Sequence, residues 1–563
     1  MYKRESLKII LTCFIIFITL LKADLSMAFG ETTISGVEYA MSLSSIRTQE
    51  YQIWKNQIWK RYGAGNSSLP AITVGKNDGS INFSWYSKQS GRENPTVQIS
   101  KKRNMKNCKI FIGKKVPISR SNGSVQYKFA NQVSVNYLKT DKVYYYRILS
   151  NTDGKTSTWS MPRKVYTGSK NRFSAILVSD VQIGASGQNG EGTIQDENIS
   201  ADTFQWERLL NQAVQKVPKA EAIFSMGDQI NYKHPDETDT YGIRESEYAG
   251  FLFPAVLRNI PLAPVIGNHE SKGSDFKFHF SVPYSKNGKG QTMSGCDYYF
   301  CREEVLTIVL NSNSRDMKAH AKLMNEAVKK HKNAKWRIVL MHHDIYGSGL
   351  LHSDTNSANL RILFAPLMDR FGIDVCFSGH DHAYTRSYFM FDGTAIQYGD
   401  KKAENPVGTL YVALGTASGS KFYPLSSEKQ FYVAERTNQT IPSFSSLVIK
   451  KNRLQLKTYN MNGEKYADDY TIVKTKQKKS YLQYKKIELL HPIKKDLGAS
   501  VLKKQYETKN DPLTYYGYAQ GKWEDITVPK RLKTGFSTLL DKTTVKKWKI
   551  SGKKLQKALQ LRN

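Results

Sequence analysis

The feature that most constrains this chain is a series of five short polar clusters, each placed directly after an apolar run. Each run is four to six residues long, which is typical of a buried strand, and helical patterns lie between the runs. Strands alternating with helices over about 280 residues predict an α/β domain whose helices cover a central sheet. Because such sheets gather polar loop residues at the carboxyl ends of their strands, we expect the clusters to converge at one edge. The clusters are 179–182, 227–229, 267–270, 341–344 and 379–382.

The apolar periodicity gives expected bounds for the elements of this domain. Helices are predicted at 202–217 and 315–331. Strands are predicted at 175–179, 222–226, 263–266, 305–310, 337–341, 375–378 and 410–414, and strands return between 444 and 473.

The clusters provide oxygen and nitrogen donors and no cysteine. The donors are Asp180, Asp228, Asn268, His342, His380 and His382. Mixed carboxylate, amide and imidazole ligation suits Mn, Fe or Zn better than Ca or a structural zinc. The donors outnumber the ligands of one tetrahedral ion, so they indicate two ions that share a carboxylate. Two ions about 3.5–4 Å apart can hold an attacking hydroxide and polarise a phosphoryl oxygen.

A region of a different rhythm precedes this domain. Between about Pro70 and Thr167 short strands alternate with turn signals such as Asp78-Gly79, which predicts a β-sandwich that resembles a fibronectin-III domain. Trp85 is expected in its core, and Tyr144 is expected to make a corner contact near Leu138. The strands are predicted at 81–86, 96–100, 127–135, 143–149 and 163–166.

The order Asp; Gly-Asp; Gly-Asn-His-Glu; His; Gly-His-x-His resembles the calcineurin-like metallophosphoesterases, and the preceding sandwich narrows the resemblance to the purple-acid-phosphatase-like branch. It covers about residues 70–473. It implies a metallophosphoesterase β-sandwich flanked by helices, preceded by an all-β fibronectin-III-like sandwich and followed by a basic C-terminal module. It also implies hydrolysis of phosphate mono- or diesters by attack of a metal-bound hydroxide, with two divalent or trivalent ions (Fe, Mn or Zn) as cofactors.

The resemblance assigns roles to single residues. Asp180, Asp228 and His382 would hold the first ion. Asp228, as the bridge, would hold the second ion together with Asn268, His342 and His380. His269 would bind the phosphate and protonate the leaving oxygen, while Glu270 would orient the loop. His352 either contacts substrate, as the family's substrate-contacting His does, or is a solvated loop residue.

Two positions depart from the family pattern. Purple acid phosphatases carry, three residues after the bridging Asp, a Tyr whose tyrosinate binds ferric iron; here that position is Asn231, and Tyr232 comes one residue later. The purple colour and an obligate Fe(III) should therefore be absent. Gln182 stands where many members have His, and it either binds the first ion through its carbonyl oxygen or hydrogen-bonds a bound water.

The N-terminus has the form of a secretory signal. Lys3, Arg4 and Lys8 precede an apolar run from Ile9 to Leu21 that is too short to span a bilayer, and small residues follow up to Ala28. We expect cleavage and secretion, with an uncleaved anchor as the alternative and no membrane span after cleavage. Outside the signal, four cysteines exclude a disulfide-built scaffold. Cys296 and Cys301 either bridge or remain thiols, and Cys376 is expected to be buried and inert.

Charge is concentrated at the other end of the chain. Residues 474–563 hold 23 Lys and Arg against 7 Asp and Glu, a net +16 of the chain's +34. These residues are either an ordinary solvated surface or a means of retention on an anionic cell-envelope polymer after secretion. No module typical of specific nucleic-acid binding accompanies them. The alternative function is therefore a non-catalytic envelope-binding protein that retains the phosphoesterase scaffold.

These predictions divide the chain into five segments. They are a signal peptide at 1–28, a partly helical lead-in with Trp54 and Trp59 at 29–69, the fibronectin-III-like domain at 70–168, the metallophosphoesterase domain at 171–473 and the basic module at 474–563.

Overall fold

The computed structural model describes most of the chain between residues 45 and 475. The described ranges are 45–88, 94–118, 128–150, 158–186, 196–233, 240–283, 288–350, 352–353, 355–391, 394–427, 429–475 and 492–495. The predicted signal peptide and nearly all of the basic module lie outside these ranges. Within them, no helix combines the length and apolarity that crossing a bilayer requires.

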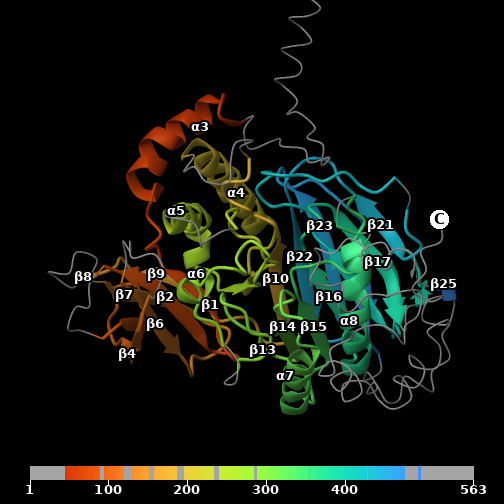
Figure 1. The fold of residues 1–563 in the computed structure, drawn as a ribbon. Helices are drawn as coiled ribbons and strands as arrows, with labels where there is room; N and C mark the ends of the chain where they lie inside the picture. The colour runs from red at the N-terminus through yellow and green to blue at the C-terminus, as the bar shows by residue number, and fades with distance from the viewer. Residues whose placement is uncertain are drawn as a thin grey trace, which may run out of the picture.

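Two large sheets face each other at the centre of the molecule (Figure 1). The described residues from 171 to 495 form the larger unit. In it, the first sheet runs β19 (Lys402–Glu404), β24 (Tyr470–Val473), β23 (Arg453–Asn460), β22 (Ser443–Lys450), β10 (Arg172–Val178), β11 (Ala222–Ser225) and β12 (Leu262–Pro264). The second runs β13 (Tyr298–Arg302), β14 (Val305–Val309), β15 (Trp336–Leu340), β16 (Val375–Ser378), β20 (Thr409–Ala413), β17 (Tyr384–Phe391), β18 (Thr394–Ile396) and β25 (Pro492–Lys495), and β21 (Val433–Thr437) pairs with β17.

Alternation along the strands of the second sheet explains why it is buried on both faces. On β15, Ile338 and Leu340 belong to the core shared with the first sheet, whereas Val339 belongs to a second core beneath helices. Successive side chains of a strand point to opposite faces, so one apolar run serves two layers. The continuous apolar runs of the sequence are the result.

Helices cover the outer faces of this sandwich. α4 (Asp196–Lys216) packs against β22 and α5 (Thr240–Leu252), while α7 (Met317–Lys330) packs against β14 and α8 (Thr355–Phe371). The short helices η2 (Ala255–Arg258) and α6 (Asp275–His279) complete this part. The prediction of one central sheet was wrong, since two sheets share the core; the sandwich flanked by helices is the fold present.

The seven strands predicted between 175 and 414 are all present, each within three residues of its expected bounds. Helix α4 begins six residues earlier than predicted. Helix α7 begins two residues later, because the side chain of Asp316 caps it by accepting a hydrogen bond from the Ala319 N–H (3.0 Å).

The N-terminal region adds a smaller two-sheet unit. One layer is β1 (Ala71–Val74), β2 (Ile81–Ser87), β6 (Phe129–Val135) and β5 (Lys114–Pro117). The other is β4 (Lys109–Ile112), β3 (Thr96–Ser100), β7 (Val143–Ser150) and β8 (Thr158–Trp159), and β9 (Arg163–Tyr166) pairs with β7. Trp85 is buried in the core between them, and the Tyr144 hydroxyl accepts a hydrogen bond from the Lys139 N–H (3.1 Å). The fibronectin-III type of this unit stays a prediction.

The two units share one sheet. Strand β1 pairs in parallel with β12 at Thr73 and Leu262, so the first sheet of the larger unit continues into the N-terminal unit. The predicted boundary near residue 170 is therefore a boundary along the chain and not a gap in the hydrogen-bonded sheet.

The segment 49–63, before the N-terminal unit, is helical and packs on the larger unit. Helix α3 (Gln49–Trp54) continues as a π-helix, η1 (Lys55–Gly63), and lies beside α4 in Figure 1. The indole N–H of Trp54 donates to Glu207 (2.8 Å) and that of Trp59 donates to Asp196 (3.1 Å). The Trp59 ring also lies edge-on to Phe253, with ring centroids 5.4 Å apart.

The cysteines whose positions are described are thiols. Cys296 and Cys301 are not bridged, so the structure favours the unbridged alternative. Cys376 is buried on β16, and burial raises the pKa of its thiol, in agreement with an inert residue.

Replacing Trp59 by Ala should destabilise the larger unit. Trp59 is 1% exposed and bonded to α4, so its removal leaves a cavity worth about 3–5 kcal/mol of the free energy of unfolding. Urea unfolding followed by circular dichroism measures the loss. Ile58→Ala, next to it in the same helix but 42% exposed, is the control and should cost less than about 1 kcal/mol. Equal losses in the two variants would show that α3 and η1 do not pack as described.

Candidate metal centre

The five polar clusters meet at one end of the sandwich. Those at 179–182, 227–229 and 267–270 follow β10, β11 and β12 of the first sheet, and those at 341–344 and 379–382 follow β15 and β16 of the second. Convergence is therefore as predicted, but it takes place between two sheets, since the strands that carry the clusters belong to both.

The backbone at these clusters is bent sharply. Five of the predicted site residues have positive φ, a region that side chains usually avoid: Asp180 (47°), Gln182 (43°), Asp228 (49°), His380 (72°) and His382 (52°). Such conformations cost about 1–3 kcal/mol each and are typical of functional sites. Glycine allows two of the bent loops to approach each other closely. A Cβ added to Gly379 would lie 1.8 Å from the Ser179 hydroxyl oxygen, so a larger residue would not fit there.

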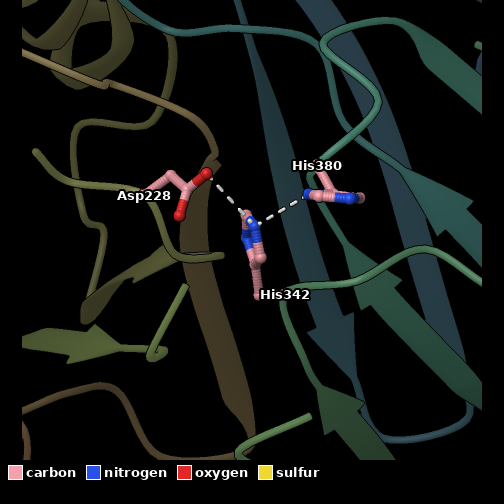
Figure 2. Close-up of side chains that lie close together, drawn as sticks. All are labelled: Asp228, His342 and His380. Atoms are coloured by element: carbon pink, nitrogen blue, oxygen red, sulfur yellow. Dashed lines mark hydrogen bonds and ion pairs between the residues drawn. The ribbon is translucent and has the colours of Figure 1, made fainter. Parts of the chain in front are cut away.

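The tightest group of donors surrounds one ring nitrogen of His342. Its Nε2 lies 2.8 Å from Asn268 Oδ1, 3.1 Å from His380 Nδ1 and 3.3 Å from Asp228 Oδ2. Figure 2 shows Asp228 and His380 on either side of this ring. Asp228, His342 and His380 offer ligand atoms that all lie within 4.8 Å of one another.

The other nitrogen of His342 fixes the chemistry of this group. Its Nδ1 lies 2.8 Å from the carbonyl oxygen of Met226, which can only accept, so Nδ1 carries the hydrogen. In the neutral ring, Nε2 then presents a lone pair to Asn268 and Asp228, whose oxygens also present lone pairs. A cation among these atoms stabilises the arrangement.

A second group lies around Asp180. One of its carboxylate oxygens accepts from the Ser179 hydroxyl (2.5 Å) and the His380 N–H (2.9 Å), whereas Oδ1 is buried and meets no hydrogen-bond partner among the residues that the structure describes. His382 donates through Nδ1 to the Lys421 carbonyl (3.1 Å), which leaves its Nε2 3.6 Å from that Oδ1. Buried oxygens without donors are costly unless a cation or proton meets them, so these residues also fit a metal ion.

Gln182 lies beside this group. Its amide nitrogen is 2.7 Å from His269 Nε2, and its Oε1 is buried without a partner. Since Nδ1 of His269 bonds the Asn231 carbonyl, the neutral His269 ring accepts the Gln182 amide hydrogen. Among the described residues, no hydrogen-bond donor meets the Gln182 carbonyl oxygen. This oxygen could bind the first ion or accept a hydrogen bond from a bound water, so both predicted roles stay open.

The pKa values show that positive charge is favoured here. Burial opposes protonation of His342, but Asp228 and Asp180 outweigh it and raise its pKa to about 9. Burial raises the pKa of Asp180, whereas at Asp228 the neighbouring His269 and His342 overcome burial and hold its pKa well below its ordinary value. A proton on His342 occupies the place a cation would take, so metal uptake should release it and should strengthen as the pH rises.

Glu270 holds the second and third clusters together. Its carboxylate accepts backbone N–H bonds from Asp228 (3.1 Å), Gln229 (2.7 Å), Ile230 (3.2 Å) and Gly267 (2.7 Å). The prediction that Glu270 orients the loop is confirmed by these bonds.

Sequence reasoning missed two parts of the support. Arg244 on α5 donates to the carbonyl oxygens of Tyr232 and His269 (3.1 Å) and pairs with Asp275, so it ties the segment after the second cluster to the third cluster. A sixth loop, 415–421 after β20, binds the first cluster, since the Thr416 hydroxyl donates to the Asp180 carbonyl (2.9 Å). The polar residues that follow the predicted strand at 410–414 were the available signal for this loop.

The remaining candidates lie at the rim. His352 donates through Nδ1 to the His380 carbonyl (2.8 Å) and stacks on the His380 ring with centroids 3.9 Å apart, so it lies beside the site. The ring of His343, next to His342 in the chain, is hydrogen-bonded to the Ser312 hydroxyl (2.8 Å). At the position of the family's Tyr, the Asn231 side-chain oxygen lies 3.4 Å from the Lys421 ammonium.

Comparison with known proteins agrees with this geometry. Residues 174–384 match the family model described as calcineurin-like phosphoesterase. The chain is similar to purple acid phosphatase 1 of Ipomoea batatas (27% identity over 325 residues, 53% of this chain and 62% of the relative) and to Fe(3+)-Zn(2+) purple acid phosphatase 12 of Arabidopsis thaliana (23% over 316 residues, 52% and 62%). Each alignment spans less than two thirds of the relative.

The fold is similar to that of purple acid phosphatase PPD1 from yellow lupin seeds, with a TM-score of 0.55 over 72% of this chain and 74% of that one at 14% identity. Residues 174–384 are thus a calcineurin-like metallophosphoesterase domain. The similar sequences and the similar fold reported above are all those of purple acid phosphatases.

Changing Glu270 to Gln should weaken metal binding without removing a proposed ligand. In the variant, the side-chain NH₂ group would face backbone N–H groups that now donate to a carboxylate oxygen of Glu270. Loss of such a supporting group typically lowers metal affinity 10–100-fold. Calorimetric titration of metal-stripped protein with Zn or Mn measures the change.

Glu464→Gln, at an exposed position far along the chain, is the matched control and should bind like the parent. Unchanged affinity in Glu270→Gln would mean that the loops hold their positions without this carboxylate.

Proposed function

We propose that this chain is a secreted dinuclear-metal phosphoesterase that hydrolyses phosphate mono- or diesters. The observation that carries the proposal is the crowding of lone pairs around Nε2 of His342, with the second crowded group at Asp180 beside it. Secretion rests on the form of residues 1–28, and attachment to an anionic envelope polymer rests on the charge of residues 474–563.

The proposed ligands follow the two groups of donors. Asp180 and His382 would hold one ion, Asn268, His342 and His380 would hold the other, and Asp228 would bridge them. When bound, such a pair of ions supplies charge neutralisation of the phosphoryl oxygens and activation of a water. The bent loops hold the donors in place before the ions arrive, so little reorganisation is needed.

Two histidines are proposed to meet the substrate. His269 Nε2 lies 3.6 Å from Asp228 Oδ2, so a phosphoryl group near the bridge would be within its reach. Burial keeps the pKa of His269 well below its ordinary value, and an anionic phosphoryl group beside it would raise that pKa toward the range of a proton donor. His352, stacked on His380, would contact the ester from the other side.

Hydrolysis should depend on metal and on Asp228. Metal-stripped protein assayed on 4-nitrophenyl phosphate should regain activity with Mn, Fe or Zn, and Asp228→Asn should lower kcat at least about 10³-fold because the bridge and its charge are lost. Asp400→Asn, at an exposed position, should leave kcat unchanged.

The same assay distinguishes the proposed enzyme from the alternative function. Bound metal with no turnover of any mono- or diester would favour the non-catalytic envelope-binding protein. Activity that survives Asp228→Asn would place the chemistry elsewhere in the chain.

The protein should not be purple when it contains iron. Asn231 cannot supply the tyrosinate of the family, and its side chain contacts Lys421 instead. We therefore expect no visible charge-transfer band in iron-loaded protein whose iron content is verified by elemental analysis. A band that disappears in Tyr232→Phe would show that the neighbouring Tyr reaches the iron.

A further inference from the structure

We propose that Lys421 is a specificity-determining residue whose ammonium group contacts the phosphoryl group and favours dianionic monoesters over monoanionic diesters. The inference rests on the proposed function and narrows its substrate class. Lys421 belongs to the sixth loop, which the five clusters of the sequence do not include.

Lys421 is connected directly to His382, a proposed ligand of the first ion, and through Asn231 to His269, the proposed phosphate-binding residue. Its backbone carbonyl accepts the hydrogen bond that orients His382 (3.1 Å). Its ammonium lies 3.4 Å from the side-chain oxygen of Asn231, and the backbone carbonyl of Asn231 bonds His269. One residue is thus connected to both sides of the space where the phosphoryl group would lie.

The contact with Asn231 leaves room for a substrate. An ammonium has three N–H donors, so one of them can meet an anionic oxygen while another keeps the 3.4 Å contact with Asn231. Lys421 is half-buried, and electrostatic attraction is stronger in such a position than in open solvent.

A second lysine adds to the positive charge on this side. Lys233 follows Asn231 by two residues, and Asn231 contacts Lys421 through its side chain and His269 through its backbone carbonyl. Two lysines therefore lie beside the loop that bonds the proposed phosphate-binding His269.

Asn231, in place of the family's Tyr, also makes this side of the site more positive. The tyrosinate implied by the family pattern is an anion, whereas Asn231 is neutral and gives the ammonium an oxygen to contact. This side of the site is accordingly more positive than the family pattern implies. Phosphate monoesters carry nearly one more negative charge than diesters at neutral pH, because their second pKa is about 6.

The test compares two substrates across three variants of the full chain. Steady-state kcat/KM is measured for 4-nitrophenyl phosphate and bis(4-nitrophenyl) phosphate in the parent, Lys421→Gln, Lys421→Arg and the exposed control Lys109→Gln, with metal content determined for each. Lys421→Gln should lose about 10–100-fold on the monoester and less than about 3-fold on the diester. Lys421→Arg should keep the parent's preference within a few-fold, and Lys109→Gln should match the parent.

Metal content should stay at the parent's level in Lys421→Gln, because its backbone carbonyl still orients His382. Equal losses on both substrates, or loss of metal, would overturn the proposal and make Lys421 a support of the loop.

Calorimetric binding of inorganic phosphate and dimethyl phosphate separates this proposal from the proposed function. If the metal-loaded parent hydrolyses neither ester but binds phosphate at least 10-fold more tightly than Lys421→Gln does, the enzyme proposal fails and the role of Lys421 stands. If the two proteins bind phosphate equally, the role of Lys421 fails.

Discussion

The hydrogen bond between His342 Nδ1 and the Met226 carbonyl is the interaction on which the account of the site depends. It fixes the imidazole so that Nε2 faces the oxygens of Asn268 and Asp228. Electron-rich atoms at 2.8–3.3 Å repel one another unless a positive charge lies among them. The raised pKa of His342 shows that a proton meets this need when no metal does.

The architecture explains how the donors come so close. Five loops leave two facing sheets at the same end, and four of the six donor residues adopt left-handed backbone conformations there: Asp180, Asp228, His380 and His382. The strain is offset by bonds that hold the loops from behind, chiefly the four N–H groups on Glu270 and the carbonyl contacts of Arg244. These buried charged groups lie behind the site and hold the loops rigid. The donor atoms themselves can therefore face a cation.

Most strands and all the donor residues could be predicted from the sequence, but the residues that support the donors could not. The donor clusters could be predicted because each follows a buried strand, and a strand's end is a local property. Strand β17 was missed because it begins two residues after His382, where the polar cluster masks its start. The roles of Arg244 and the 415–421 loop depend on contacts between residues tens to hundreds of positions apart, which no local pattern records. The pairing of β1 with β12 is likewise a long-range event.

The number of transition ions bound per chain tests the central claim most directly. Purified protein, stripped of metal and reloaded with Zn or Mn, should take up two ions after dialysis, and His342→Ala should lose at least one of them. A parent chain that binds no ion, or a His342→Ala variant that binds as many ions as the parent, would contradict the account.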